Sequence, residues 1–200
     1  MLIASLSVHE AAHAWAADRL GDPTARLLGR LSLNPVVHVD PIGTLLFPLI
    51  AMLTNVPLIG WAKPVPVNVK NLKRGRRDYV LVAAAGPASN LLIAVVASVA
   101  LGLVTVSPMR VGEPNVSAPL AALLAQAVPL NILLAVFNMI PIPPLDGGNV
   151  LGGLLPQPIG AKYDALMRPY GFVLLYALIL TRGFDYVVIP PARFLLSLLQ

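Results

Sequence analysis

Two long stretches of this 200-residue chain contain no charged side chain, namely residues 79–109 and residues 114–145. Each exceeds the roughly 20 residues that a helix needs to cross a bilayer. The pattern therefore predicts one crossing over residues 79–106 and a return crossing over residues 118–140. Further along, it predicts an inside loop that contains Lys162 and Arg168, followed by one or two apolar helices over residues 170–181 and 186–199.

The first 20 residues also predict a helix, apolar apart from one polar cluster near its middle and a charged end at Asp18 and Arg19. Residues 21–23 (Gly-Asp-Pro) end it, because proline cannot continue the backbone hydrogen-bond ladder. Only eight residues precede the cluster, which makes the helix short for a full crossing. Either the N-terminus is truncated or mis-started, or the helix begins part-way into the membrane.

The segment between this helix and the first long crossing has two parts. Residues 24–40 alternate loosely between apolar and polar side chains, which predicts an extended or hairpin-like segment at the membrane edge. Residues 41–62 are uncharged, and basic residues flank them on both sides. A full crossing would place one basic group outside, against the positive-inside tendency, whereas a re-entrant hairpin keeps both inside. We therefore expect a re-entrant hairpin between the first and second spanning helices.

Composition supports a membrane location for the whole chain. It is 57% hydrophobic and 12% charged, with a mean hydropathy of +0.79, which leaves too little charge to cover a soluble domain. We expect residues 1–200 to form a single membrane-embedded domain, an all-α polytopic helical bundle. The net charge of +5 does not indicate nucleic-acid binding, because no known reader motif accompanies it. The absence of cysteine excludes disulfides and thiolate metal ligands.

The polar cluster of the first helix is His9-Glu10-Ala11-Ala12-His13. Side chains at positions i and i+4 share a helix face, so both imidazoles can reach one metal ion. Glu10 lies about 100° around the helix, where it can act as a general base on a metal-bound water. Ionisable groups inside a membrane cost several kcal/mol each unless paired, and a metal would pair these. A purely structural cluster of polar groups is the alternative.

Catalytic zinc takes three protein ligands and keeps a fourth position for water. Candidates for the third ligand at membrane depth are His38, Asp40 and Asp146. We favour Asp146, because the two glycines after it permit close backbone approach and the prolines before it free backbone groups. The alternative role for Asp146 is to cap a helix over residues 147–155. His38 is then structural, or it orients a ligand with help from Asp40.

Topology derived from charge supports the same choice. The first helix leaves the membrane on the inside just after His13, and the third helix arrives on the inside near Asp146. Both therefore lie at the same depth.

These motifs resemble the site-2 protease family of intramembrane metalloproteases. The resemblance rests on His9-Glu10-x-x-His13 in an apolar helix, followed by Asn138-x-x-Pro141-x-Pro143-x-Leu145-Asp146-Gly147. Residues 29–35, 38–43 and 85–90 also resemble its compact prokaryotic branch, which has no peptide-binding or nucleotide-sensing domain. The resemblance covers nearly the whole chain. It implies one catalytic zinc ion on His9, His13 and Asp146, Glu10 as the catalytic base, and an active site near the cytoplasmic side of the membrane.

Two asparagines lie in predicted membrane helices, where an amide needs partners. We expect Asn90, Asn138 or both to bind the substrate backbone or the developing oxyanion near the metal. Hydrogen bonding between helices is the alternative.

The chain is thus predicted to be a multi-pass zinc metalloendopeptidase of the cell membrane. The resemblance implies that its partners are transmembrane protein substrates within the lipid bilayer. The alternative is a membrane metal transporter or sensor that uses the same ligands. Transport would require more polar residues along a path across the bilayer, and the two charge-free stretches provide almost none.

Overall fold

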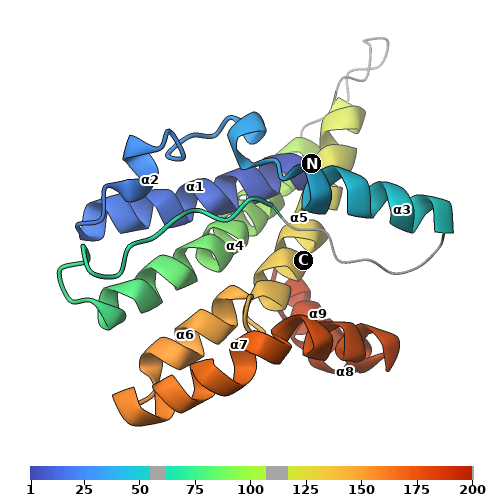
Figure 1. The fold of residues 1–200 in the computed structure, drawn as a ribbon. Coiled ribbons are helices and arrows are strands. Elements are labelled where there is room, and N and C mark those ends of the chain that lie inside the picture. The colour runs from blue at the N-terminus through green and yellow to red at the C-terminus, as the bar shows by residue number, and fades with distance from the viewer. Residues whose placement is uncertain (55–61, 107–116, 200) are drawn as a thin grey trace, which may run out of the picture.

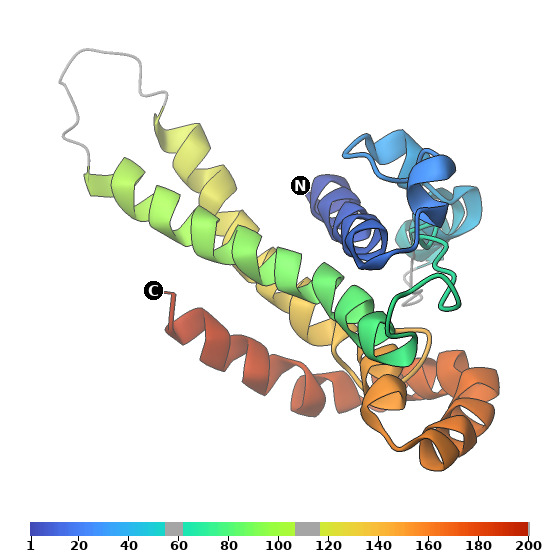
Figure 2. The ribbon, with the colours of Figure 1, turned by 90° about the vertical axis from the view of Figure 1, so that its left-hand side faces the viewer.

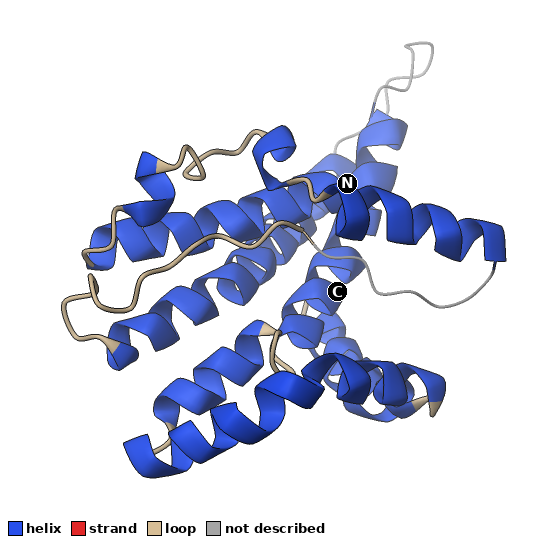
Figure 3. Ribbon diagram, in the orientation of Figure 1, coloured by secondary structure: helices blue, strands red, loops and turns tan. Residues whose placement is uncertain are grey.

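The computed structural model describes residues 1–54, 62–106 and 117–199 (Figure 1). Throughout these residues the regular elements are helices and none is a strand, which confirms the all-α prediction (Figure 3). In chain order they are α1 (Leu2–Leu20), α2 (Thr24–Leu27), η1 (Pro35–His38), η2 (Pro41–Leu46), α3 (Phe47–Thr54), α4 (Arg76–Val106), α5 (Ser117–Asn138), α6 (Asp146–Leu154), α7 (Gln157–Leu180), α8 (Gly183–Val187) and α9 (Ile189–Ser197).

Three helices in the described part of the chain are long and apolar enough to cross a membrane. They are α4, α5 and α7, with 31, 22 and 24 residues. Large apolar side chains on all three are exposed, among them Leu103, Leu123 and Val173. An apolar surface of this extent suits lipid rather than water. The protein is therefore a membrane protein, and the two predicted crossings correspond to α4 and α5.

The third long helix differs from the prediction. Lys162 and Arg168 were expected in a loop, yet both lie inside α7. Long Lys and Arg side chains can extend their charges toward water from a largely apolar helix. These two charges therefore do not indicate a loop between helices.

Helix α4 is the centre of the arrangement, and α1, α5 and α6 all pack against it (Figure 2). Small side chains form much of the contact with α5, where Ala94 and Ala97 meet Ala127, Val128 and Ile132. Small residues let membrane helices approach closely, which strengthens van der Waals packing. The close approach also brings polar groups on neighbouring helices within hydrogen-bonding distance.

Helix α1 turns one face toward α4. Ser5, His9, His13 and Ala17 recur at every fourth position and are all buried. Gly21 then ends α1 in the left-handed conformation, with φ of 115°, as the Gly-Asp-Pro sequence predicted. The two histidines therefore face the interior of the bundle.

The extended or hairpin-like structure predicted for residues 24–40 is wrong over residues 24–27 and 35–38, where α2 and η1 form helical turns. Side chains just before each turn explain this. Asp22 Oδ1 accepts a hydrogen bond from Thr24 N, and Asn34 Oδ1 accepts one from Val36 N. Such local bonds favour turns over extended structure whatever the alternation of apolar residues.

The segment predicted to be re-entrant begins with two consecutive helices, η2 and α3, which occupy residues 41–54. Residues 55–61, including Trp61, lie outside the described residues. The re-entrant course of this segment therefore stays a prediction.

Residues 62–68, here called the strap, run without regular structure alongside α1 (Figure 1). At one end, the fully buried carboxylate of Asp22 accepts hydrogen bonds from Asn68 N at 2.6 Å and Asn71 Nδ2 at 2.9 Å. At the other end, the buried Arg30 guanidinium donates to the carbonyl oxygens of Lys63 and Pro64. Buried hydrogen bonds at both ends fix the strap relative to α1.

Candidate metal centre

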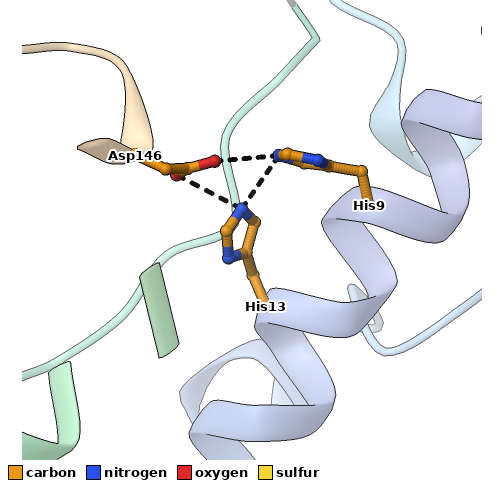
Figure 4. Close-up of side chains that lie close together, drawn as sticks. All are labelled: His9, His13 and Asp146. Atoms are coloured by element: carbon orange, nitrogen blue, oxygen red, sulfur yellow. Dashed lines mark hydrogen bonds and ion pairs between the residues drawn. The ribbon is translucent and has the colours of Figure 1, made fainter. Parts of the chain in front are cut away.

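Three side chains from distant parts of the chain converge between α1 and α6 (Figure 4). His9 and His13 belong to α1, and Asp146 is the first residue of α6. The two Nε2 atoms lie 3.1 Å apart. Asp146 Oδ2 lies 3.0 Å from His9 Nε2, and Oδ1 lies 3.3 Å from His13 Nε2. The ligand atoms of all three therefore surround one point.

This arrangement fits a metal ion. Bonds of about 2.0–2.1 Å at tetrahedral angles would place ligand atoms about 3.3 Å apart, close to the observed distances. Asp146 Oδ2 is buried, and within the described residues it has no hydrogen-bond partner; His9 Nε2 lies 3.0 Å from it. A buried carboxylate oxygen without a donor is costly, and a cation would satisfy it. The residue types, two imidazoles and one carboxylate, suit zinc.

The far edge of the His13 ring fixes which nitrogen faces the metal position. His13 Nδ1 lies 2.7 Å from the carbonyl oxygen of Val82 on α4. A carbonyl can only accept, so Nδ1 carries the proton and Nε2 presents its lone pair. The equivalent nitrogen of His9 lies 2.6 Å from Asn90 Oδ1. Metal-binding histidines are commonly oriented by such contacts.

Gly86 lets α4 approach the two imidazoles. A Cβ atom at this position would lie 2.5 Å from His9 Nε2 and would also collide with His13 Nε2. Any larger residue would therefore occupy space beside the ligand atoms. Gly86 was expected only as part of the 85–90 stretch, with no role of its own. The available signal was its spacing of four from Asn90, which places both on one helix face.

Asp146 does not cap its helix, since the N-cap position is Leu145 and no side-chain capping bond is present. As predicted, the two glycines after Asp146 let the backbone at the start of α6 approach the preceding turn closely. A Cβ on Gly147 would lie 2.6 Å from the Ile140 carbonyl oxygen, and one on Gly148 would lie 2.7 Å from the Ile142 carbonyl carbon. The start of α6 thus packs directly on the preceding turn, which holds Asp146 toward α1.

Glu10 lies beside the three ligands, in the wall of a cavity of about 1170 Å³. Its Oε2 accepts a hydrogen bond from Val65 N of the strap at 3.1 Å. The other walls are largely apolar and include Leu6, Phe137 and Leu175. The cavity therefore combines the Glu10 carboxylate, the three side chains that could hold a metal ion and room for an apolar chain.

The two asparagines lie in different places. Asn138 lines the cavity, and its Nδ2 donates to the Leu134 carbonyl at 2.9 Å. Asn90 is fully buried behind His9 and is not part of the cavity wall. The structure therefore brings Asn138 to the cavity wall and Asn90 to the ring of His9.

The other candidates for the third ligand lie elsewhere. His38 Nε2 lies 2.8 Å from the Ser32 carbonyl oxygen, and Asp40 Oδ1 caps η2 by accepting from Ile42 N and Gly43 N. The expected pairing of His38 with Asp40 is thus replaced by a backbone contact. Neither residue belongs to the group that could hold a metal ion.

The chain resembles known proteins both in family and in sequence. The family model of "Peptidase family M50" matches residues 101–178. A Bacillus subtilis (strain 168) protein named "Putative zinc metalloprotease YwhC" is 39% identical over 94% of this chain and 82% of its own length. "Putative zinc metalloprotease Rip2" of Mycolicibacterium smegmatis is 32% identical over 88% of this chain and 64% of its own length. No solved structure matches the chain.

Proposed function

The chain belongs to peptidase family M50, the site-2 proteases, and we propose that it hydrolyses peptide bonds in or near transmembrane segments of other membrane proteins. It is a zinc metalloprotease of that family. The observation that carries the proposal is the cavity, in which Glu10 and three metal ligands lie among apolar side chains of a membrane protein. Such a cavity suits an apolar peptide.

The proposed reaction assigns one role to each side chain. His9, His13 and Asp146 would hold a zinc ion, which when bound activates water and polarises the scissile carbonyl. Glu10 takes a proton from the attacking water as the oxygen adds to the carbonyl carbon. Glu10 then delivers that proton to the amine as the C–N bond breaks. Asn138, which lines the same cavity, is proposed to contact the substrate backbone.

Charge distribution supports a site nearer the cytoplasmic side. Arg76 and Arg77 begin α4, whereas its other end carries no charged residue. At 1.5 Å per residue, Gly86 lies about 15 Å from Arg76 and about 30 Å from Val106 along the helix. Since basic residues favour the cytoplasmic side, the metal centre lies closer to that surface. Water can therefore reach it over a short path.

The alternative of metal transport receives less support. Within the described parts of α4 and α5, the buried Asn90 and Asn131 hydrogen-bond to each other and do not line the cavity. A transport path needs polar groups that face a continuous opening. The arrangement instead supports one catalytic site within a single cavity.

The test compares wild-type protein with Glu10→Gln, which keeps size and polarity but cannot take a proton. We expect full zinc content in both proteins and a loss of cleavage of about 10²–10⁴-fold in the variant. The substrate is a model transmembrane helix, offered in two forms that differ only in a helix-weakening Gly-Pro pair. Helical carbonyls are shielded by their own hydrogen bonds, so the weakened helix should be cleaved faster. Equal cleavage by wild type and Glu10→Gln would refute the proposal.

A further inference from the structure

A chain of hydrogen bonds leads from the His9 ring across two helices. Asn90 Oδ1 on α4 lies 2.6 Å from His9 Nδ1. Asn90 Nδ2 donates to Asn131 Oδ1 on α5 at 2.9 Å. Asn131 Nδ2 donates to the carbonyl oxygen of Ala127 at 2.9 Å. Here these contacts are called the amide relay.

The relay is closed to solvent. His9, Asn90 and Asn131 are 4%, 0% and 1% exposed. A buried amide group without a partner costs free energy, so each nitrogen and oxygen of the relay must use the partner beside it. The orientation of each amide is therefore determined by its neighbours.

The direction of the whole relay follows from its far end. The Ala127 carbonyl can only accept a hydrogen bond, so the Asn131 amide must present its nitrogen there and its oxygen to Asn90. Asn90 then presents its nitrogen to Asn131 and its oxygen to His9. An oxygen beside His9 Nδ1 requires a proton on that nitrogen. His9 Nε2 consequently carries a lone pair that faces the metal position.

We propose that Asn131, which lies outside the metal site, is a positioning residue that selects the metal-binding tautomer of His9 through Asn90. The proposal rests on the proposed function in one respect, that His9 is a zinc ligand. If Asn90 turned its amide over, its nitrogen would face His9 Nδ1, and the ring proton would move to Nε2. That proton would block metal binding. Asn131 supplies the acceptor that distinguishes the two orientations.

The first measurement is zinc affinity by chelator competition in four variants. Groups that orient a metal ligand contribute about 10–100-fold to affinity, so we expect losses in that range for Asn90→Ala and toward its lower end for Asn131→Leu. Asn131→Asp should stay close to wild type. A protonated carboxyl has one hydroxyl donor for Ala127 and one carbonyl acceptor for Asn90, which reproduces the amide.

The double variant N90A/N131L separates positioning from general packing. If Asn131 acts through Asn90, removing Asn131 in the Asn90→Ala background should produce no further loss of zinc affinity. Independent losses that multiply would overturn the proposal, as would wild-type affinity in Asn131→Leu. If Asn131→Leu does not fold, Asn131→Asp decides: affinity near wild type supports the relay, and affinity as weak as in Asn90→Ala overturns it.

A second readout does not depend on zinc. In zinc-free protein with ¹⁵N-labelled histidine, the His9 ring nitrogens report which one carries the proton, with assignment from His9→Gln. We expect a protonated Nδ1 in wild type and a change of tautomer in Asn131→Leu, and the same tautomer in both would overturn the relay. A wild-type protein that bound no zinc would refute the proposed function, and the relay would then be judged by this readout alone.

Discussion

Gly86→Ala adds a single methyl group where α4 meets the Nε2 edge of both imidazoles. The added Cβ would lie 2.5 Å from His9 Nε2, whereas ordinary van der Waals contact begins at 3.4 Å. The ring, or the helix that carries it, must therefore retreat by about 0.9 Å. Neither imidazole can retreat freely, because His9 and His13 are also held at Nδ1.

The expected loss follows from that displacement. Protein ligands of zinc lie within about 0.2 Å of their ideal distances, so a shift several times larger removes a ligand from the coordination sphere. Misplacement of about 1 Å costs on the order of 100-fold in activity. We expect Gly86→Ala to lower both zinc affinity and cleavage of a transmembrane substrate by at least about 100-fold.

Gly102→Ala is the matched control, because Gly102 lies on the same helix and a Cβ there meets nothing within 4 Å. Both variants gain the same methyl group and the same change in helix propensity. Chelator competition measures zinc affinity, and cleavage of the transmembrane substrate measures activity. Wild-type zinc affinity in Gly86→Ala would refute the steric reasoning, and an equal loss in Gly102→Ala would assign the effect to the helix as a whole.

Three further predictions concern the strap and the metal. Arg30→Ala should free the strap, so that Val65 no longer fixes the position of Glu10. Cleavage of the transmembrane substrate should then fall about 10–100-fold while zinc content stays unchanged. A loss of zinc would contradict this prediction. Burial raises the pKa of the Asp22 carboxyl, but hydrogen bonds from Thr24, Asn71 and Asn68 outweigh it and lower that pKa overall. The Asp22 carboxylate therefore contributes fully to the free energy of unfolding above about pH 4, and this contribution is lost as pH falls through its lower pKa in the folded protein. When the free energy of unfolding is measured against pH, Asp22→Asn should lack this pH-dependent contribution. Finally, for protein held at a free zinc concentration of 1,000 times its Kd, removing the zinc should lower the free energy of unfolding by about 4 kcal/mol. Thermal unfolding of the zinc-free protein, before and after zinc is restored, measures this loss of stability.

The sequence predicted the parts of the molecule that depend on local spacing. His9 and His13 share a helix face because they are four residues apart, and α4 and α5 follow from two long charge-free stretches. Asp146 could be chosen as a ligand because few ionisable residues lie at membrane depth. Each of these inferences needs only one helix or one segment.

What escaped prediction depends on how helices pack. For Asn90, contact with substrate and hydrogen bonding between helices were both open, and the structure shows the second. Its partner Asn131 lies 41 positions away on α5, and only the α4–α5 contact brings them together. The backbone N–H of Val65 contacts Glu10 across 55 positions, and no side-chain pattern marks a backbone donor. Gly86 matters through the space it leaves empty. Sequence periodicity carries no information of this kind.

The division of the metal ligands between α1 and α6 has a consequence for the order of synthesis. Two proposed ligands and Glu10 belong to α1, which leaves the ribosome before α6, since Asp146 follows more than 130 residues later. A nascent chain that has reached only α5 holds two imidazoles and no carboxylate ligand. Its proposed catalytic centre is therefore incomplete until α6 has been made and has packed against α4. Separation of the proposed ligands along the chain thus makes completion of the site depend on assembly of the helical bundle.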